Sequence, residues 1–305
     1  MEQRLAYFEF DSSILTVEVL MTSKTFRFGT VGSPISTPKK PGGSVGAVLR
    51  LAELDLKALE LGWVRSVRIS EQACAGIMTA ALDQDVYISV HAPYYINLNA
   101  NEEEWPNSRQ RLADAAHYGN LAGARDIVFH PGSYFGNPAE QVLPLAIERL
   151  ENLVQELRRG GNPVTLRPET MGKSAMLGSL QDTLEMSRSI PGVLPCLDFA
   201  HLHARAGDGS MNSYTEWASV LEEYGKVLGE SSLQDLHIHL SGIEYGEKGE
   251  KNHLPLEEAD LDLKALFRAL LDFNCGGRML CESPLLEEDA QRLVQWWLEA
   301  GGSVE

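Results

Sequence analysis

Histidines and carboxylates recur at the ends of apolar β-type segments along this chain of 305 residues. They are His91 in HAPYYINL, His130 in FHPGSY, Glu169 in LRPETMGK, Asp198 and His201 in CLDFAHLH, His239 in HIHLSG and Glu282 in LCESP. Imidazole and carboxylate ligands without sulfur suit zinc, manganese, iron or cobalt, and a carboxylate can bridge two ions. Because buried charges are costly unless they are paired or metal-bound, the set predicts a metal centre.

The elements that would position these residues alternate between β-type runs and amphipathic helical stretches, the pattern of parallel strands joined by crossover helices. Strands are predicted near Phe26–Val31, Lys57–Leu61, Val86–His91, Asp126–His130, Val164–Glu169, Val193–Asp198, Leu236–Leu240 and Arg278–Glu282. Helices are predicted near Ser44–Leu54, Glu71–Leu82, Ser108–Ala122, Ala139–Arg159, Leu180–Ser189, Ser213–Leu228, Leu263–Asp272 and Glu287–Glu299. Eight such units favour a single (β/α)8 TIM barrel over an open doubly wound sheet, since closure leaves no edge strand.

The barrel places the candidate ligands together. Its functional residues gather at the C-terminal ends of the strands. The third to eighth predicted strands end in His, His, Glu, Asp, His and Glu, so we expect a metal cluster at the C-terminal mouth. Each residue taken alone also fits a buried histidine, an ion pair or a helix cap, and it is their clustering that favours metal.

Three other histidines are expected to have structural or ambiguous roles. His237 is on the same predicted strand as His239, and we expect its side chain on the opposite side of the sheet. The role of His203 is ambiguous, because it lies beside the DxxH motif formed by Asp198 and His201. His117, within a predicted helix, is not expected to be a ligand.

The N-terminal segment stands apart from the predicted barrel. Residues 1–24 form an extension before the barrel domain of residues 25–305. Met21 stands where such a barrel could begin, so the true start could lie there. Alternatively, Leu5–Phe10 and Ile14–Leu20 have β-type composition and could add a strand that plugs the barrel floor.

Composition narrows the classes of partner. The net charge of −17 argues against broad electrostatic binding to nucleic acid. No segment approaches the ~20 apolar residues of a membrane helix, and no signal peptide is recognisable. Four cysteines without a CxxC pair suggest a reducing cytoplasm, and the absence of an exposed apolar stripe suggests a monomer.

Basic residues nevertheless recur in the predicted loops that follow the strands. They are Lys39, Lys40, Arg65, Arg68, Lys173, Arg205, Lys248 and Lys251. Around the mouth they could draw in a phosphodiester backbone, or they could simply be solvated loop residues.

From about Phe28 to Glu299 the motifs resemble the endonuclease IV family of apurinic/apyrimidinic endonucleases, within the xylose-isomerase-like barrels. The resemblance implies one zinc held by His91, His130 and Glu169, a second held by Glu169, Asp198, His239 and Glu282, and a third held by His201 and His253. It implies two to three Zn²⁺ ions, with Mn²⁺ or Co²⁺ as alternatives. The implied reaction cleaves double-stranded DNA 5′ to an abasic site and leaves a 3′-hydroxyl, and Glu169 is the carboxylate expected to influence the attacking hydroxide.

The same resemblance implies DNA contacts at the mouth. Tyr94 and Tyr95 follow His91 where family members present residues that wedge into DNA beside the lesion. Lys173 and Lys251 are further candidate DNA-binding residues.

The chain departs from the family at the third metal. The family has Asp-x-His where this chain has Lys251-Asn252-His253, so a carboxylate ligand is replaced by a cation. Glu250 or Glu247 could substitute, and otherwise the third ion is weak or absent.

Two other functions remain open on sequence grounds. Glu169, Asp198, His239 and Glu282 alone match the single-metal set of related sugar isomerases and epimerases, in which two glutamates would shuttle a proton beside a carbonyl. A non-catalytic binder of nucleic acid or metabolite on the same barrel is the third interpretation. Metal stoichiometry separates the sugar enzyme from the endonuclease, because sugar chemistry needs one ion and phosphodiester cleavage two or three.

Overall fold

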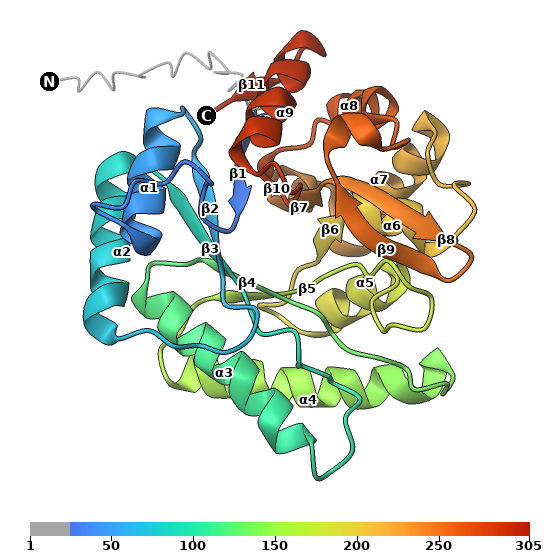
Figure 1. The fold of residues 1–305 in the computed structure, drawn as a ribbon. Coiled ribbons are helices and arrows are strands. Elements are labelled where there is room, and N and C mark those ends of the chain that lie inside the picture. The colour runs from blue at the N-terminus through green and yellow to red at the C-terminus, as the bar shows by residue number, and fades with distance from the viewer. Residues whose placement is uncertain (1–24) are drawn as a thin grey trace, which may run out of the picture.

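The chain forms a ring of parallel strands surrounded by helices (Figure 1). The computed structural model describes residues 25–305, so the expectations for the N-terminal extension lie outside the described residues. The ring consists of β1 (Thr25–Val31), β2 (Ala58–Gly62), β3 (Tyr87–His91), β4 (Asp126–Phe129), β5 (Thr165–Pro168), β6 (Cys196–Asp198), β7 (Leu236–Leu240) and β10 (Gly277–Cys281). The predicted (β/α)8 barrel is confirmed.

Parallel ladders join these strands in the order β5-β4-β3-β2-β1-β10-β7-β6. Isolated parallel bridges pair Leu166 with Val193 and Glu169 with Cys196, which link β5 to β6 and nearly close the ring. Every ligand candidate that follows a strand therefore emerges at the same end of the barrel.

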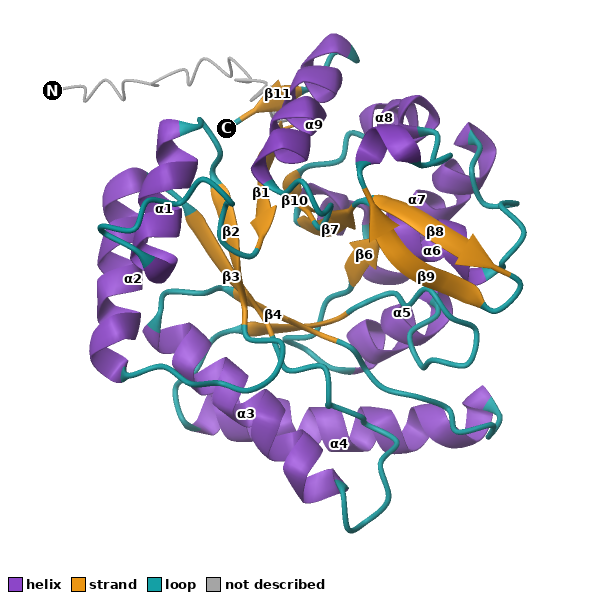
Figure 2. Ribbon diagram, viewed as in Figure 1, coloured by secondary structure: helices purple, strands orange, loops and turns teal. Residues whose placement is uncertain are grey.

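The predicted helices are all present and cover the outside of the ring (Figure 2). They are α1 (Gly43–Glu53), α2 (Glu71–Gln84), α3 (Trp105–Leu121), α4 (Ala139–Arg159), α5 (Leu180–Ser189), α7 (Tyr214–Leu228), α8 (Leu263–Asp272) and α9 (Glu287–Glu299). Capping boxes at Ser179 and Ser213 define where α5 and α7 begin. Trp297 of α9 packs edge-on against Phe26 in the core. None of the described helices is long and apolar enough to cross a membrane.

A helix and a hairpin near the mouth were not predicted. The helix α6 (Phe199–Arg205) starts directly after β6, and β8 (Gly242–Gly246) pairs with β9 (Gly249–Leu254) in an antiparallel hairpin after β7. Figure 1 shows the hairpin lying over α6. Three minor elements complete the described chain: the 3-10 turns η1 (Glu230–Gln234) and η2 (Leu256–Glu258), and β11 (Ser303–Val304), which pairs with β1.

Charged side chains fill the barrel interior beneath the mouth. Asp126 forms ion pairs with Arg167 Nε at 2.7 Å and with Arg278 Nη2 at 2.9 Å. His237 Nδ1 lies 3.1 Å from the same carboxylate, so His237 points into the barrel, where His239 also points. The prediction that His237 faces the opposite side was wrong, because residues two apart on a strand share a face.

Gly29 of β1 has a packing role that a sequence pattern does not reveal. A Cβ at this position would lie 1.6 Å from the carbonyl oxygen of Ala58 on the neighbouring strand. Gly29→Ala must therefore push β1 and β2 apart, and we expect a loss of about 1–3 kcal/mol in the free energy of unfolding. Urea denaturation would measure it.

The matched control is Gly76→Ala in α2, where a Cβ would lie 3.7 Å from a Val45 methyl group. This change should be neutral or stabilising by about 0.5–1 kcal/mol, because alanine favours helix. Equal effects of the two substitutions would contradict the steric argument.

Candidate metal centre

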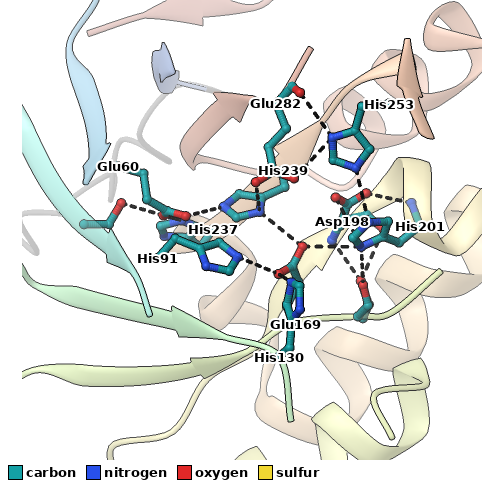
Figure 3. Close-up of polar contacts among 12 residues, drawn as sticks. Glu60, His91, His130, Glu169, Asp198, His201, His237, His239, His253 and Glu282 are labelled. Carbon is teal, nitrogen blue, oxygen red and sulfur yellow. Dashed lines mark hydrogen bonds and ion pairs between the residues drawn. The ribbon is translucent and has the colours of Figure 1, made fainter. Parts of the chain in front are cut away.

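Glu169 lies at the centre of the candidate ligands (Figure 3). The carboxylate is fully buried and follows β5. Its Oε2 lies 3.3 Å from His91 Nε2 and 3.2 Å from His130 Nε2. Its Oε1 lies 3.3 Å from His201 Nδ1 and 3.3 Å from His239 Nδ1. Each oxygen therefore faces a different pair of imidazoles, so the carboxylate lies between two sets of candidate ligands.

The DxxH motif has a local structural explanation. Asp198 is the N-cap residue of α6, and its Oδ1 accepts a hydrogen bond from the His201 backbone N–H at 2.7 Å. The cap holds both side chains on the first turn of the helix. Asp198 Oδ2 is buried and accepts no hydrogen bond from the residues that the structure describes. One oxygen of Asp198 therefore caps the helix and the other remains available as a ligand.

Backbone carbonyls fix the orientation of three candidate histidines. Nδ1 donates to Ala92 O at 2.9 Å in His91, to Thr170 O at 3.0 Å in His201 and to Glu282 O at 3.2 Å in His253. A ring whose Nδ1 carries the proton presents its Nε2 lone pair on the other side, as metal-binding histidines commonly do.

Glu60 is a residue of the site that the sequence argument missed. His239 Nδ1 faces Glu169 and also lies 3.5 Å from Glu282 Oε1, while its Nε2 lies 3.0 Å from Glu60 Oε1. Glu60 is fully buried in β2 and accepts a hydrogen bond from Ser89 Oγ at 2.7 Å. A glutamate within the apolar run ALELG was the available signal, because such a residue rarely enters a core unpaired.

The electrostatics of the site reflect burial and close charges. Burial raises the pKa of Asp198 to about 6, against the opposing effect of His201. Burial also disfavours the charged form of His91, but the adjacent Glu169 carboxylate raises its pKa to about 9. Despite burial, the surrounding histidines hold the pKa of Glu169 well below its usual range. The centre thus combines buried carboxylates with imidazoles whose protons a divalent cation would displace.

The ligand atoms converge closely enough to share ions. Among the described residues, five groups have ligand atoms within 4.8 Å of one another, and three of them consist only of predicted ligands. These three are His91, His130 and Glu169; Glu169, Asp198, His239 and Glu282; and Asp198, His201 and His253. The structure thus brings together all eight sequence-predicted ligands, and the donor set fits divalent metal.

His203 and His117 lie outside these groups of ligand atoms. His203 is held between Met211 O, 2.9 Å from its Nδ1, and Asp260 Oδ1, 2.9 Å from its Nε2, which indicates a structural role. His117 is exposed on α3.

The predicted DNA-binding residues lie at the rim. Tyr94 and Tyr95 are 52% and 65% exposed, and the Tyr94 ring stacks on His130 with 5.2 Å between centroids. Lys173 is exposed. Lys251 is exposed and its Nζ lies 3.2 Å from Glu244 Oε1.

Arg205 is committed elsewhere, because its guanidinium donates to the carbonyls of Met171, Lys173 and Met176. Its guanidinium is therefore not available to contact a phosphodiester backbone.

A family model described as xylose isomerase-like TIM barrel matches residues 48–300, and the chain belongs to this family. It is 39% identical over 273 residues to Uncharacterized protein MJ0133 of Methanocaldococcus jannaschii, covering 89% of this chain and 97% of that protein. It is 31% identical over 171 residues to Probable endonuclease 4 of Oceanobacillus iheyensis, covering 52% of this chain and 53% of that relative. The chain thus spans about half the length of this endonuclease 4 relative.

Solved structures agree with the fold. Endonuclease IV from Thermus thermophilus superposes with a TM-score of 0.64 at 22% identity, covering 90% of this chain and 99% of that chain. A D-tagatose 3-epimerase-like protein gives 0.66 at 18% identity, covering 88% and 97%.

Proposed function

We propose that this protein is a metal-dependent phosphodiesterase of the endonuclease IV type, which nicks double-stranded DNA 5′ to an abasic site and leaves a 3′-hydroxyl. The observation that carries the proposal is the approach of His91 and His130 to Glu169 Oε2, at 3.3 and 3.2 Å. These two histidines form a second ligand group beside the four-residue set that a single-metal sugar enzyme would need. The similarity to endonuclease 4 sequences supports the same conclusion.

The chain's own residues would hold two to three Zn²⁺ ions, with Mn²⁺ or Co²⁺ as alternatives. Such ions supply Lewis-acid chemistry, which activates water and neutralises the charge of a phosphodiester. Glu169 would be shared between two of the ligand groups that hold the ions. Glu60 would keep His239 in position from behind. No protein nucleophile is required.

DNA would approach over the aromatic and basic rim. Tyr94, Tyr95 and Phe135 are 52%, 65% and 65% exposed, and aromatic faces can stack on a base beside a lesion. Lys173 and Lys251 lie exposed in segments that follow β5 and β7 and would contact phosphates. The Lys251–Glu244 pair is exposed and thus weak enough to be exchanged for a phosphate contact.

The direct test is incubation with a duplex that carries one abasic analogue. We expect a single nick 5′ to the analogue, a 3′-hydroxyl that a polymerase can extend, and loss of nicking after chelation. An undamaged duplex of the same sequence is the control. Absence of cleavage with zinc, manganese and cobalt would rule out the proposal.

A sugar isomerase or epimerase is the second candidate. Glu169, Asp198, His239 and Glu282 form a complete ligand group by themselves, which would suffice for proton transfer beside a carbonyl. That function would need one ion per chain and would incorporate solvent deuterium into a ketose. Two or three ions that fall in number in His91→Ala would favour the phosphodiesterase.

A further inference from the structure

His201 and His253 present their Nε2 atoms to each other, at a separation of 3.5 Å. Each ring is anchored at Nδ1 by a backbone carbonyl, as described above. Two nitrogens on one tetrahedral zinc, each about 2.0–2.1 Å from it, stand roughly 3.4 Å apart. The pair therefore has the spacing of two ligands of one ion. A complete site still needs a carboxylate.

Position 251 cannot provide that carboxylate. Its residue is a lysine, 54% exposed in its side chain, and its Nζ lies 3.2 Å from Glu244 Oε1. A cation at this position would repel a metal ion.

Glu250, one residue earlier, does reach His201. Its Oε2 lies 3.6 Å from His201 Nε2, and its backbone N–H donates to Gly172 O at 2.9 Å. The latter bond fixes the start of β9 against the loop after β5, so that the carboxylate stands beside α6.

A β-bulge explains why Glu250 points toward this side. In the β8–β9 hairpin Glu244 pairs with Asn252 and Tyr245 with Glu250, so Lys251 is an extra residue in β9. In a regular strand, residues 250 and 253 would face opposite sides. One extra residue reverses the alternation and returns both to the same side, a known effect of bulges beside functional sites.

Gly172 provides the space for the Glu250 side chain. A Cβ on Gly172 would lie 2.7 Å from Glu250 Cβ, 2.7 Å from Glu250 Oε2 and 3.1 Å from His201 Cδ2. The glycine therefore lets the carboxylate lie against His201, and any larger residue would displace it.

We propose that Glu250 is the carboxylate ligand of a third divalent metal ion, which it binds together with His201 and His253. This inference rests on the metal centre of the proposed function but is independent of its DNA substrate. Asp198, whose ligand atom also lies near both histidines, is the competing carboxylate.

The test is zinc content by elemental analysis, combined with competition against a chromophoric chelator, for Glu250→Gln and Glu247→Gln. Glu247 is exposed in the same hairpin, so its variant controls for the lost charge. We expect three ions in the wild type and in Glu247→Gln. In Glu250→Gln we expect one ion to bind at least about tenfold more weakly, because loss of a residue that merely orients a metal ligand already weakens binding by about 10–100-fold.

A second pair of variants identifies which ion is lost. His253→Ala should lose the same ion, and Glu250→Gln combined with His253→Ala should lose one ion rather than two. Far-UV circular dichroism and urea denaturation in EDTA check that every variant folds as the wild type does.

The inference is overturned if the wild type binds two ions, or if Glu250→Gln retains the third at wild-type affinity, which would assign the site to Asp198. A protein that binds three ions but does not nick abasic DNA would refute the proposed function and leave this inference standing.

Discussion

Replacing Glu169 by glutamine should lower kcat/KM for nicking of abasic DNA by at least about a thousandfold, equivalent to about 4 kcal/mol of transition-state stabilisation. Glutamine keeps the shape of the side chain but removes its charge. Both Glu169 oxygens face imidazoles at 3.2–3.3 Å, so the amide would also present an N–H group to a position that requires a ligand lone pair. Single-turnover cleavage and metal content on the same preparation would measure both effects.

Glu185→Gln is the control for that substitution. Glu185 is a glutamate of α5 that pairs with Arg188 on the protein surface, remote from the mouth, and its loss should leave cleavage and metal content unchanged. If Glu169→Gln cleaves within tenfold of the wild type, Glu169 does not bridge the ions, and the His91 and His130 group must act without it.

The barrel was predictable because its evidence is local. Apolar runs such as Val86–His91 and amphipathic stretches such as Ala139–Arg159 have the periods of strand and helix, and both lie within a residue of the observed bounds. Strand ends then place His91, His130 and Glu169 on one face through the topology alone. The convergence of the candidate ligands thus follows from the order of elements in the sequence.

Other parts of the site depend on contacts between distant segments. Glu250 joins His201 only because a bulge in β9 reverses the alternation of side chains, and a hairpin register cannot be derived from the polar sequence GEKGEKNHL. Glu60 meets His239 across the barrel interior, which requires knowledge of which strands face each other. The error at His237 was different, since the two-residue period of a strand already places it on the His239 side.

The second large expected effect is a loss of folding stability when one of the buried charges below the mouth is removed. Asp126 is buried and pairs with Arg167, whose side chain is fully buried, and with Arg278, which is 6% exposed. Asp126→Asn leaves two buried guanidinium groups without this carboxylate. We expect a loss of about 3–5 kcal/mol in the free energy of unfolding, the range for removing one partner of a buried ion pair, because Asp235, the other carboxylate that contacts both arginines, is 57% exposed in its side chain. Urea denaturation in EDTA would measure it apart from any contribution of metal.

Asp235→Asn provides a matched control, because Asp235 contacts the same two arginines at 3.2 and 2.5 Å but its side chain is 57% exposed. Water can replace its carboxylate, so we expect a loss of about 0–1 kcal/mol. Similar losses for the two variants would show that burial is not what makes the Asp126 contacts strong. Full metal content in a destabilised Asp126→Asn protein would show that the interior charges stabilise the barrel, while the histidines and carboxylates at the mouth bind the ions.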